Sequence, residues 1–292
     1  MPRVLVNGPA SWNTLVRLAA LPEPRSQTLF ASSHHDGLGG TSAGKAMTLA
    51  ALGVDVTLHT ALGDDREGAL VRAALAHPRI SVVTRAVEKT ERHVNLMADD
   101  GSRVSLYLEL PQPAPGAAPS LDGMDVAVLD LADHSRPLLS AARAAGVPVW
   151  CDVHDDDGVS GYPRDFVAGA DVLLVSAARL DDPRAYLADA VSRGCRLAVC
   201  TDGAAGALAL DADGWIEVPA APVAEVVDTN GAGDAFFAGL LSGVLEGLPV
   251  ERALARASAA GAVAVGAHDL GAPSATVPAL DDRADGVVIR RL

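Results

Sequence analysis

Residues 228–239 of the chain read Asp-Thr-Asn-Gly-Ala-Gly-Asp-Ala-Phe-Phe-Ala-Gly, and no other stretch says as much about the fold. A run rich in valine, Val223 to Val227, comes directly before it. Apolar residues at helical spacing come after its last aspartate: Phe237, Leu240, Leu241, Val244 and Leu245. The pattern predicts a strand, a tight glycine turn and a helix that begins at Asp234.

The predicted turn has the chemistry of an anion site. The backbone N–H groups of Gly231, Ala232 and Gly233 would lie unpaired at a helix N-terminus, where they attract phosphate. Asp234 places a carboxylate in the same turn. A helix cap is the simplest alternative role for it, but the flanking glycines favour a general base. An anion cradle beside a base is what phosphoryl transfer to a hydroxyl requires.

Composition limits the class of protein. The chain has 292 residues, of which 49% are apolar, enough for a substantial core in one α/β domain. Aromatic residues are only 3%, which argues against a surface that stacks nucleic-acid bases. With 23 basic and 37 acidic side chains the net charge is −14, which disfavours nucleic acid and anionic membranes as partners. Bound phosphate would therefore be held by backbone amides.

Cysteine usage and the N-terminal sequence point to the cytoplasm. The three cysteines, Cys151, Cys195 and Cys200, form no CxxC pair and lie in apolar runs, so we expect buried free thiols. Residues 1–8 enter a strand at once and lack the apolar core of a signal peptide. No apolar run has the length of a membrane span.

Strand and helix patterns alternate along most of the chain. The predicted strands are near-continuous apolar runs: Val4–Val6, Val54–Thr60, Asp125–Asp130, Val147–Asp152, Asp171–Val175 and Leu197–Thr201. The predicted helices have apolar residues at a 3.6-residue period: Ser42–Leu52, Arg66–Ala76, Ser135–Ala145, Arg184–Arg193, Asp234–Glu246 and Glu251–Val265. This order predicts a doubly wound, mostly parallel sheet between two helical layers.

Two segments interrupt the alternation. Residues 80–108 read as successive strands, Ile80–Thr84, His93–Met97 and Ser102–Leu108, with a hairpin turn at Asp99-Asp100-Gly101. Ser11–His35 has no strong helical period. We interpret the two segments as a small β-sheet lid, built from about residues 11–36 and 88–110, on a single domain that spans residues 1–292. A second hairpin, Gly206–Leu210 with Trp215–Val218, is assigned to the core.

The stretch Gly39-Gly40-Thr41-Ser42-Ala43-Gly44-Lys45 matches the phosphate-binding pattern G-x-x-x-x-G-K. Ala46 stands where that motif needs a hydroxyl for magnesium, and residues 32–36 before it are not a buried strand, so we reject a true phosphate-binding loop. A glycine turn that lets the backbone approach a substrate explains the double glycine better.

The two glycine motifs together resemble the ribokinase-like (PfkB-type) family of sugar and nucleoside kinases. The family's first signature is a Gly-Gly turn and a helix that ends in Leu-Gly, here Gly39-Gly40 to Leu52-Gly53. Its second signature, DTxGAGDxFxAG, is matched throughout residues 228–239. Residues 62–68 and Thr201-Asp202-Gly203 with Gly206 are further similar stretches.

The resemblance implies an ATP-dependent kinase and a role for each matching residue. Asp234 would take the proton from the acceptor hydroxyl, and the amides of Gly231, Ala232 and Gly233 would hold the γ-phosphoryl group. A second set would lie near the nucleotide or a possible K⁺ loop: Thr201, Gly203, Gly206, Asp228, Thr229 and Asn230. A third set would contact the acceptor: Asn13, Gly39, Gly40, Thr41, Gly44 and Asp234.

The chain departs from the family pattern at the acceptor and at magnesium. Asn13 stands where the family has an acceptor-binding aspartate, and Gly44 where it has an asparagine. Ser176 and Arg179 stand where the family has Asn-x-x-Glu, which is linked to magnesium. A guanidinium cannot ligate a cation, so the nucleotide's phosphates and water would hold Mg²⁺, and no protein residue is predicted as a metal ligand.

Two further groups of polar residues are weaker candidates. His34, His35 and Asp36 could form a metal cluster or touch the acceptor, but exposed polar residues near the lid are the simpler interpretation. Asp152 ends a predicted strand, where α/β sheets bind their ligands, whereas Asp155 to Asp157 fit a solvated turn.

The sequence thus predicts a ribokinase-like fold that transfers the ATP γ-phosphoryl group to a small sugar. A nucleoside is the alternative acceptor, because Asn13 and Gly44 weaken the usual sugar contacts and Gly44 leaves room for a bulkier group. A non-catalytic regulatory protein that binds nucleotide or sugar is the third reading, motivated by Ser176 and Arg179. By analogy with the family, a homodimer through the lid is expected.

Overall fold

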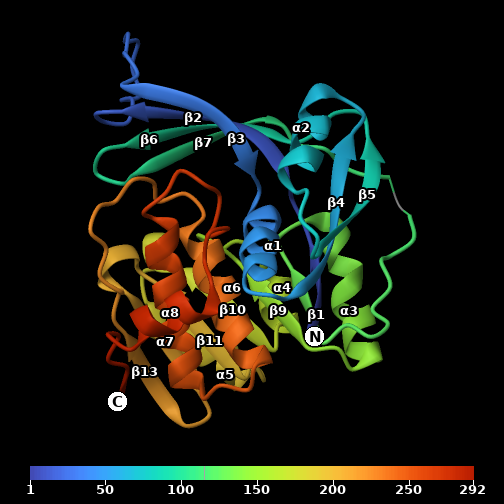
Figure 1. Cartoon of the computed structure of the whole chain (residues 1–292), viewed down its shortest axis with the longest axis vertical. Coiled ribbons are helices and arrows are strands. Elements are labelled where there is room, and N and C mark those ends of the chain that lie inside the picture. Colours follow the sequence, from blue (N-terminus) through green and yellow to red (C-terminus); the bar gives the residue numbers. More distant parts are fainter. Residues whose placement is uncertain (115) are drawn as a thin grey trace.

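The computed structural model describes residues 1–114 and 116–292. It contains a ten-stranded sheet between helical layers and a separate four-stranded sheet across one end of the molecule (Figure 1). The strands of the large sheet are β1 (Arg3–Asn7), β4 (Asp55–Gly63), β5 (Ile80–Val87), β8 (Val126–Leu129), β9 (Val149–Asp152), β10 (Val172–Ser176), β11 (Leu197–Thr201), β12 (Ala207–Asp211), β13 (Gly214–Val218) and β14 (Arg290–Arg291). The strands of the small sheet are β2 (Ser11–Leu18), β3 (Ser33–Gly39), β6 (Arg92–Ala98) and β7 (Arg103–Glu109).

The large sheet has the order β14-β13-β12-β11-β10-β9-β8-β1-β4-β5. The strands from β11 through β10, β9, β8, β1 and β4 to β5 all pair in parallel, and the hairpin β12–β13 with β14 adds an antiparallel edge. The sequence prediction of a doubly wound, mostly parallel sheet is confirmed, and so is the second hairpin.

Eight α-helices complete the fold: α1 (Thr41–Ala51), α2 (Arg66–Ala74), α3 (Arg136–Ala145), α4 (Arg164–Gly169), α5 (Pro183–Ser192), α6 (Ala232–Leu245), α7 (Val250–Ala264) and α8 (Val277–Ala284) within the described residues. Local chemistry sets several of their ends. Asp65 caps α2 by accepting a hydrogen bond from the amide of Gly68, and Gly146 ends α3 in the left-handed conformation.

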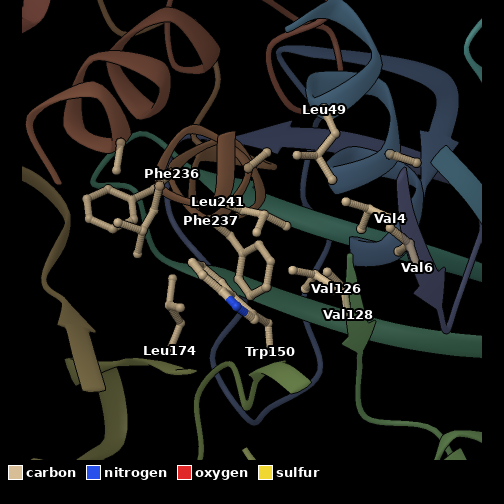
Figure 2. Close-up of a cluster of buried hydrophobic side chains, with 14 of the residues drawn as sticks. Val4, Val6, Leu49, Val126, Val128, Trp150, Leu174, Phe236, Phe237 and Leu241 are labelled. Atoms are coloured by element: carbon tan, nitrogen blue, oxygen red, sulfur yellow. The ribbon is translucent and has the colours of Figure 1, made fainter. Parts of the chain in front are cut away.

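Side chains of successive strand residues pack into different helical layers. Val126 and Val128 of β8 pack with α1, α6 and α7, whereas Ala127 and Leu129 pack with α3, α4 and α5. Trp150 and Phe237 meet edge to face at a centroid distance of 5.6 Å in the first of these cores (Figure 2). The alternation follows from the two-residue period of a strand covered on both faces. All three cysteines are free and buried, as predicted.

The small sheet has the order β3-β2-β6-β7 and continues the chain from the carboxyl end of β1 (Figure 1). β2 pairs with β3 antiparallel and with β6 in parallel, and β6 pairs with β7 antiparallel around the Asp99-Asp100-Gly101 turn. The prediction that Ile80–Thr84 belongs to the lid is wrong, because β5 pairs along β4 in the large sheet.

The structure of residues 223–234 differs from the prediction. Val223–Val227 form no strand, and Val226 is 57% exposed. At the β13 end of the large sheet, Arg290 and Arg291 of β14 pair with Glu217 and Ile216 of β13 instead. Helix α6 begins at Ala232 rather than at Asp234, with Gly231 as its N-cap, so Asp234 lies inside the first turn.

Candidate active site

The parallel strands bring their carboxyl ends to one edge of the large sheet. Asn7, Asp152, Ser176 and Thr201 end β1, β9, β10 and β11, and Asp130 directly follows β8. Helices α1 and α6 begin beside this edge, so the two glycine motifs of the sequence meet there. Ligands of open α/β sheets bind at such an edge.

The start of α6 forms the turn that the sequence predicted, with distinct tasks for its two glycines. Gly231 has a φ of 77°, and a Cβ there would lie 2.5 Å from the amide nitrogen of Gly271, so only glycine fits. Gly233 is exposed, and a Cβ on it would meet nothing within 4 Å. The turn therefore packs against the protein at its first glycine and is open at its second.

The backbone amides of this turn are only partly available to a ligand. The amide of Ala232 donates to the carbonyl of Thr229 at 3.3 Å, whereas Gly231 and Gly233 donate to no acceptor among the described residues. The amide of Asn230 donates to Asp228 Oδ1 at 2.8 Å. Of the three amides predicted to hold phosphate, those of Gly231 and Gly233 are therefore the free ones.

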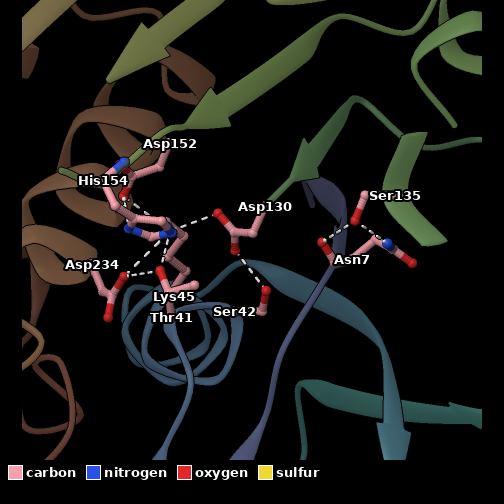
Figure 3. Close-up of polar contacts among 9 residues, drawn as sticks. All are labelled: Asn7, Thr41, Ser42, Lys45, Asp130, Ser135, Asp152, His154 and Asp234. Atoms are coloured by element: carbon pink, nitrogen blue, oxygen red, sulfur yellow. Dashed lines mark hydrogen bonds and ion pairs between the residues drawn. The ribbon is translucent and has the colours of Figure 1, made fainter. Parts of the chain in front are cut away.

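Asp234 is nearly buried, with 9% of its surface exposed, and its two carboxylate oxygens differ in their surroundings. The hydroxyl of Thr41 donates to Oδ1, and Lys45 Nζ lies 3.3 Å from the same oxygen. Oδ2 accepts no hydrogen bond from the described residues (Figure 3). Burial raises the pKa of this carboxyl above its ordinary value, although Lys45 and Thr41 act in the opposite direction.

Lys45 lies behind Asp234 as a completely buried cation. Its Nζ is 2.8 Å from Asp130 Oδ1 and 3.1 Å from Asp152 Oδ2, and it also donates to the hydroxyl of Thr41. Burial alone would lower the pKa of the Lys45 ammonium, but the nearby carboxylates raise that pKa well above its ordinary value. Lys45 is therefore charged and points into the protein, consistent with the rejection of a phosphate-binding loop.

Two residues on the β9 side frame the same cluster. Burial would raise the pKa of Asp152, but Lys45 and His154 lower it below its ordinary value. His154 follows two residues later, with Nδ1 3.7 Å from Asp152 Oδ2, and is partly exposed. Figure 3 shows the His154 imidazole beside Asp152. The sequence pattern predicts Asp152 at the site but indicates no role for His154 or Lys45.

Four of the predicted acceptor residues, Gly39, Gly40, Thr41 and Gly44, lie between the end of β3 and the first turns of α1, whereas Asn13 lies on β2 and Asp234 on α6. A Cβ on Gly39 would collide with the side-chain amide of Asn13. A Cβ on Gly40, which has a φ of 89°, would collide with the backbone of Pro9. Asn13 is buried, and its Oδ1 accepts a hydrogen bond from the amide of His93 at 3.1 Å. The double glycine therefore allows the end of β3 to pack closely against β2 and against the connection that precedes β2.

Gly44 does not open the space that the sequence analysis expected. A Cβ at this position would lie 2.8 Å from Asp234 Oδ2, so the carboxylate already occupies the space beside the glycine. The expectation of room there for a bulkier acceptor is wrong. Instead, Gly44 is needed because α1 approaches α6 closely at the side chain of Asp234.

The predicted nucleotide residues fall into two groups around the edge. Thr201 ends β11, and the turn after it contains Gly203, with a φ of 49° and open surroundings, and Gly206, where a Cβ would lie 2.2 Å from the carbonyl of Val218. Asp228 is buried before α6, and Thr229 and Asn230 are more exposed. Asp228, Thr229 and Asn230 directly precede the α6 turn in the chain, whereas Thr201, Gly203 and Gly206 lie at the carboxyl end of β11.

The position linked to magnesium by resemblance offers no cation ligand set. The Ser176 hydroxyl accepts from the amide of Ala178, and Arg179 Nη2 lies 3.0 Å from Asp157 Oδ2. A guanidinium that already pairs with a carboxylate fits neither direct Mg²⁺ ligation nor a free phosphate contact. The protein residues present here do not fit a magnesium ion.

A separate cluster joins the small sheet to the body. His35 of β3, Asp228 and His268 place ligand atoms within 4.8 Å of one another, a spacing that could hold a metal ion. Arg17 of β2 competes for this carboxylate, since its Nη2 lies 3.8 Å from Asp228 Oδ2 and donates to the carbonyl of Val227. The preferred interpretation of His34 and Asp36 as exposed polar residues is confirmed, and Asp36 accepts a hydrogen bond from Thr14. The alternative metal grouping of His34, His35 and Asp36 is not formed, because His35 lies with Asp228 and His268 instead.

A doubly wound sheet, a small sheet across one end and a glycine turn beside a buried aspartate define an α/β phosphotransferase. The model of the pfkB family of carbohydrate kinases matches residues 12–277. The chain belongs to this family, whose members are ATP-dependent kinases that phosphorylate a sugar hydroxyl. No helix in the described part of the chain is long and apolar enough to cross a membrane.

Named relatives are similar over nearly the whole chain. An acarbose 7(IV)-phosphotransferase from Actinoplanes sp. is 34% identical over 282 residues, which cover 89% of this chain and 91% of the relative. An ATP-dependent ribose-1-phosphate kinase from Halopiger xanaduensis is 33% identical over 282 residues, 91% of this chain and 93% of the relative.

Solved structures have the same fold. A microbiome-derived acarbose kinase has a TM-score of 0.81 and 29% identity, over 97% of this chain and 99% of that chain. Ribokinase from Arabidopsis thaliana, solved with ribose and ATP, has a TM-score of 0.77 at 23% identity over 97% and 98% of the two chains, a likeness of fold.

Proposed function

We propose that Asp234 is the general base of a sugar kinase that uses ATP. Asp234 Oδ2 accepts the proton of the acceptor hydroxyl, the acceptor oxygen forms a bond to the γ-phosphorus, and the bond from that phosphorus to the β–γ bridging oxygen breaks to release ADP. The free amides of Gly231 and Gly233 stabilise the charge on the transferring group. The observation that carries this proposal is the free Oδ2 of a nearly buried carboxylate in the same turn as an open glycine.

Three further assignments complete the nucleotide side of the proposal. Thr201, Gly203 and Gly206 line the phosphates of ATP, because their turn stands at the same sheet edge with an open glycine. Mg²⁺ is held by the nucleotide's phosphates and water rather than by Ser176 or Arg179. A K⁺ requirement through Asp228 is disfavoured by the nearby Arg17.

For the acceptor we propose a hydroxyl of a small sugar or a sugar-like molecule. Acarbose is the first compound to test, because two relatives named for it align along the chain at 34% and 29% identity. A nucleoside is the second candidate, favoured by the neutral Asn13 in place of an aspartate. Gly44 does not favour a nucleoside by leaving room for its base, since Asp234 fills the volume beside Gly44.

The proposal also includes a homodimer formed through the small sheet. β7 is an edge strand whose alternate side chains Val104, Leu106 and Leu108 are exposed, which leaves an apolar ribbon beside unpaired backbone groups. A second copy of the same surface could cover both.

The testing experiment combines an acceptor panel with one substitution. ADP release from ATP is measured with acarbose, D-ribose, D-fructose and inosine for the wild type and for Asp234→Asn. We expect one sugar-like acceptor to dominate and the substitution to lower its turnover by about 100- to 10,000-fold with an unchanged thermal midpoint. Near-normal turnover in Asp234→Asn would remove this residue from the mechanism, and nucleotide binding without turnover of any acceptor would favour a regulatory protein.

A further inference from the structure

Burying Lys45 behind Asp234 costs free energy of folding. Lys45 has no exposed surface, and its charge is balanced by Asp130, Asp152 and Asp234, which come from three other parts of the chain (Figure 3). Removing a lysine and several carboxylates from water costs several kcal/mol per ion, and well-packed apolar residues would often be as stable. Stability alone therefore does not explain why the chain places these ions here.

The ion cluster of Lys45, Asp130, Asp152 and Asp234 contacts only one of the two carboxylate oxygens of Asp234. Lys45 faces Oδ1 at 3.3 Å and also donates to Thr41, whose hydroxyl donates to the same Oδ1. Asp130 and Asp152 hold the ammonium from the other side at 2.8 Å and 3.1 Å. The carboxylate is therefore fixed through one oxygen, while Oδ2 keeps its lone pairs for an incoming proton.

Each partner of Lys45 is itself held in place. Asp130 Oδ2 accepts from the Ser42 hydroxyl at 2.6 Å, and Asp152 Oδ1 accepts from the amide of His154 at 2.9 Å. Phe237 places its ring under the ammonium, 4.9 Å from Nζ, and adds a cation–π contact. The ammonium thus has a fixed position set by α1, β8, β9 and α6.

We propose that Lys45, held by Asp130 and Asp152, is a positioning residue that orients the carboxylate of Asp234 and keeps it ionised as the base. The inference rests on the proposed role of Asp234. It assigns to this chain an internal ion cluster that acts on the base without touching either substrate.

The charges around Asp234 determine how its pKa, and therefore the activity, should change when Lys45 is removed. Lys45 faces it from α1, and Asp152 and His154 face it from the end of β9, with Asp130 behind the lysine. Burial and Asp152 favour the protonated form of Asp234, whereas Lys45 and His154 favour the ionised form. Loss of Lys45 therefore raises the pKa of Asp234, so that the base becomes protonated, and activity is lost, at a higher pH than in the wild type.

The double variant Lys45→Met/Asp130→Asn tests this, because it removes one positive and one negative charge and so keeps the net charge of the cluster. With ATP and acarbose, or D-ribose if that acceptor reacts faster, we expect kcat to fall about 10- to 1000-fold, with little change in the KM for ATP. The acid limb of the kcat profile should move up by about 1 to 3 pH units. Lys89→Met, at the exposed lysine paired with Glu109 in the small sheet region, is the matched control and should behave as the wild type.

A measurement without turnover separates this inference from the role of Asp234. Carbon-13 NMR of labelled aspartate carboxyls, with the Asp234 signal assigned by its absence in Asp234→Asn, should show a higher pKa for Asp234 in the double variant. If Asp234→Asn keeps its turnover, the proposed base is wrong, while the titration still shows whether Lys45 keeps that carboxyl ionised. An unchanged titration and an unchanged acid limb in the double variant would overturn the inference while leaving the base in place.

Thr41→Val provides the test if the double variant does not fold, because it keeps volume and charge and removes only the hydroxyl that donates to Asp234 Oδ1. We expect a fall in kcat of about 10-fold or more with an unchanged KM for ATP. A Thr41→Val enzyme with wild-type kcat would contradict the orienting role of the cluster.

Discussion

His154 is the one residue other than glycine, among those described, whose backbone lies in the left-handed region, with a φ of 53°. Such a conformation costs on the order of 1 kcal/mol for a residue with a Cβ and persists where surrounding contacts determine it. Here the amide donates to Asp152 Oδ1 and the carbonyl accepts from the amide of Ser176 at 2.6 Å. This backbone conformation places the imidazole beside Asp152, which pairs with Lys45 next to Asp234.

Replacing His154 separates the cost of its backbone from the use of its side chain. His154→Gly should be more stable than His154→Ala by about 1 kcal/mol, because glycine adopts a positive φ without a steric penalty. If the imidazole faces the acceptor, both variants lose kcat/KM to the same extent. Urea unfolding and ADP release measure the two effects. A stable His154→Gly enzyme with full activity would show that the imidazole contributes nothing to turnover.

At the same scale, the sequence predicted Asp234 and its glycines but not Lys45. The signature around Asp234 is local, so its turn and its carboxylate can be read from consecutive residues. The burial of Lys45 depends on Asp130 and Asp152, which meet it only when the sheet has formed. A lone lysine in a helix is normally exposed, and nothing in the sequence around it signals the distant carboxylates.

At the scale of elements, the N-terminal turn of helix α6 is the proposed phosphate site, and its two glycines give a matched pair of substitutions. Gly231→Ala should destabilise the protein by about 1 to 3 kcal/mol, because the new Cβ meets Gly271 at a positive φ. Gly233→Ala meets no atom within 4 Å and should leave stability nearly unchanged. If the turn holds the transferring phosphoryl group, Gly233→Ala should still lower kcat/KM for ATP about 10-fold or more.

Thermal unfolding and steady-state kinetics check both halves of this comparison. A Gly233→Ala enzyme that is stable and fully active would show that the open side of the turn does not face phosphate. A fully stable Gly231→Ala would instead contradict the close packing of this turn against Gly271.

The two strand predictions that were wrong depend on which strands pair in the sheet rather than on the strand propensity of the residues. Val223–Val227 has strand-like composition but pairs with no strand, and the C-terminal residues of β14 pair with β13 instead. Ile80–Val87 was recognised in part as a strand, yet its assignment to the lid was wrong, since β4 offers it eight paired residues in the large sheet. Local residue types do not specify which partner a strand selects.

At the scale of the whole molecule, the alternation of apolar strands and amphipathic helices was sufficient to predict the layered fold. The right-handed crossover rule leaves few ways to connect parallel strands, so a correct order of elements restricts the topology. How the small sheet contacts the body was not predictable, because those contacts join distant residues such as Arg17 with Val227 and His35 with His268.

The exposed ribbon of β7 gives the molecule-scale prediction, a dimer that a single charge disrupts. Leu106 is 47% exposed on an edge strand, and Leu106→Glu would bury a carboxylate in the proposed interface. The cost of at least about 3 kcal/mol should raise the dimer dissociation constant roughly 100-fold or more. Val83→Glu is the control, because Val83 is similarly exposed at 43% but lies on β5 in the large sheet. In sedimentation at micromolar concentration we expect dimers for the wild type and for Val83→Glu and monomers for Leu106→Glu, whereas a monomeric wild type would refute the dimer.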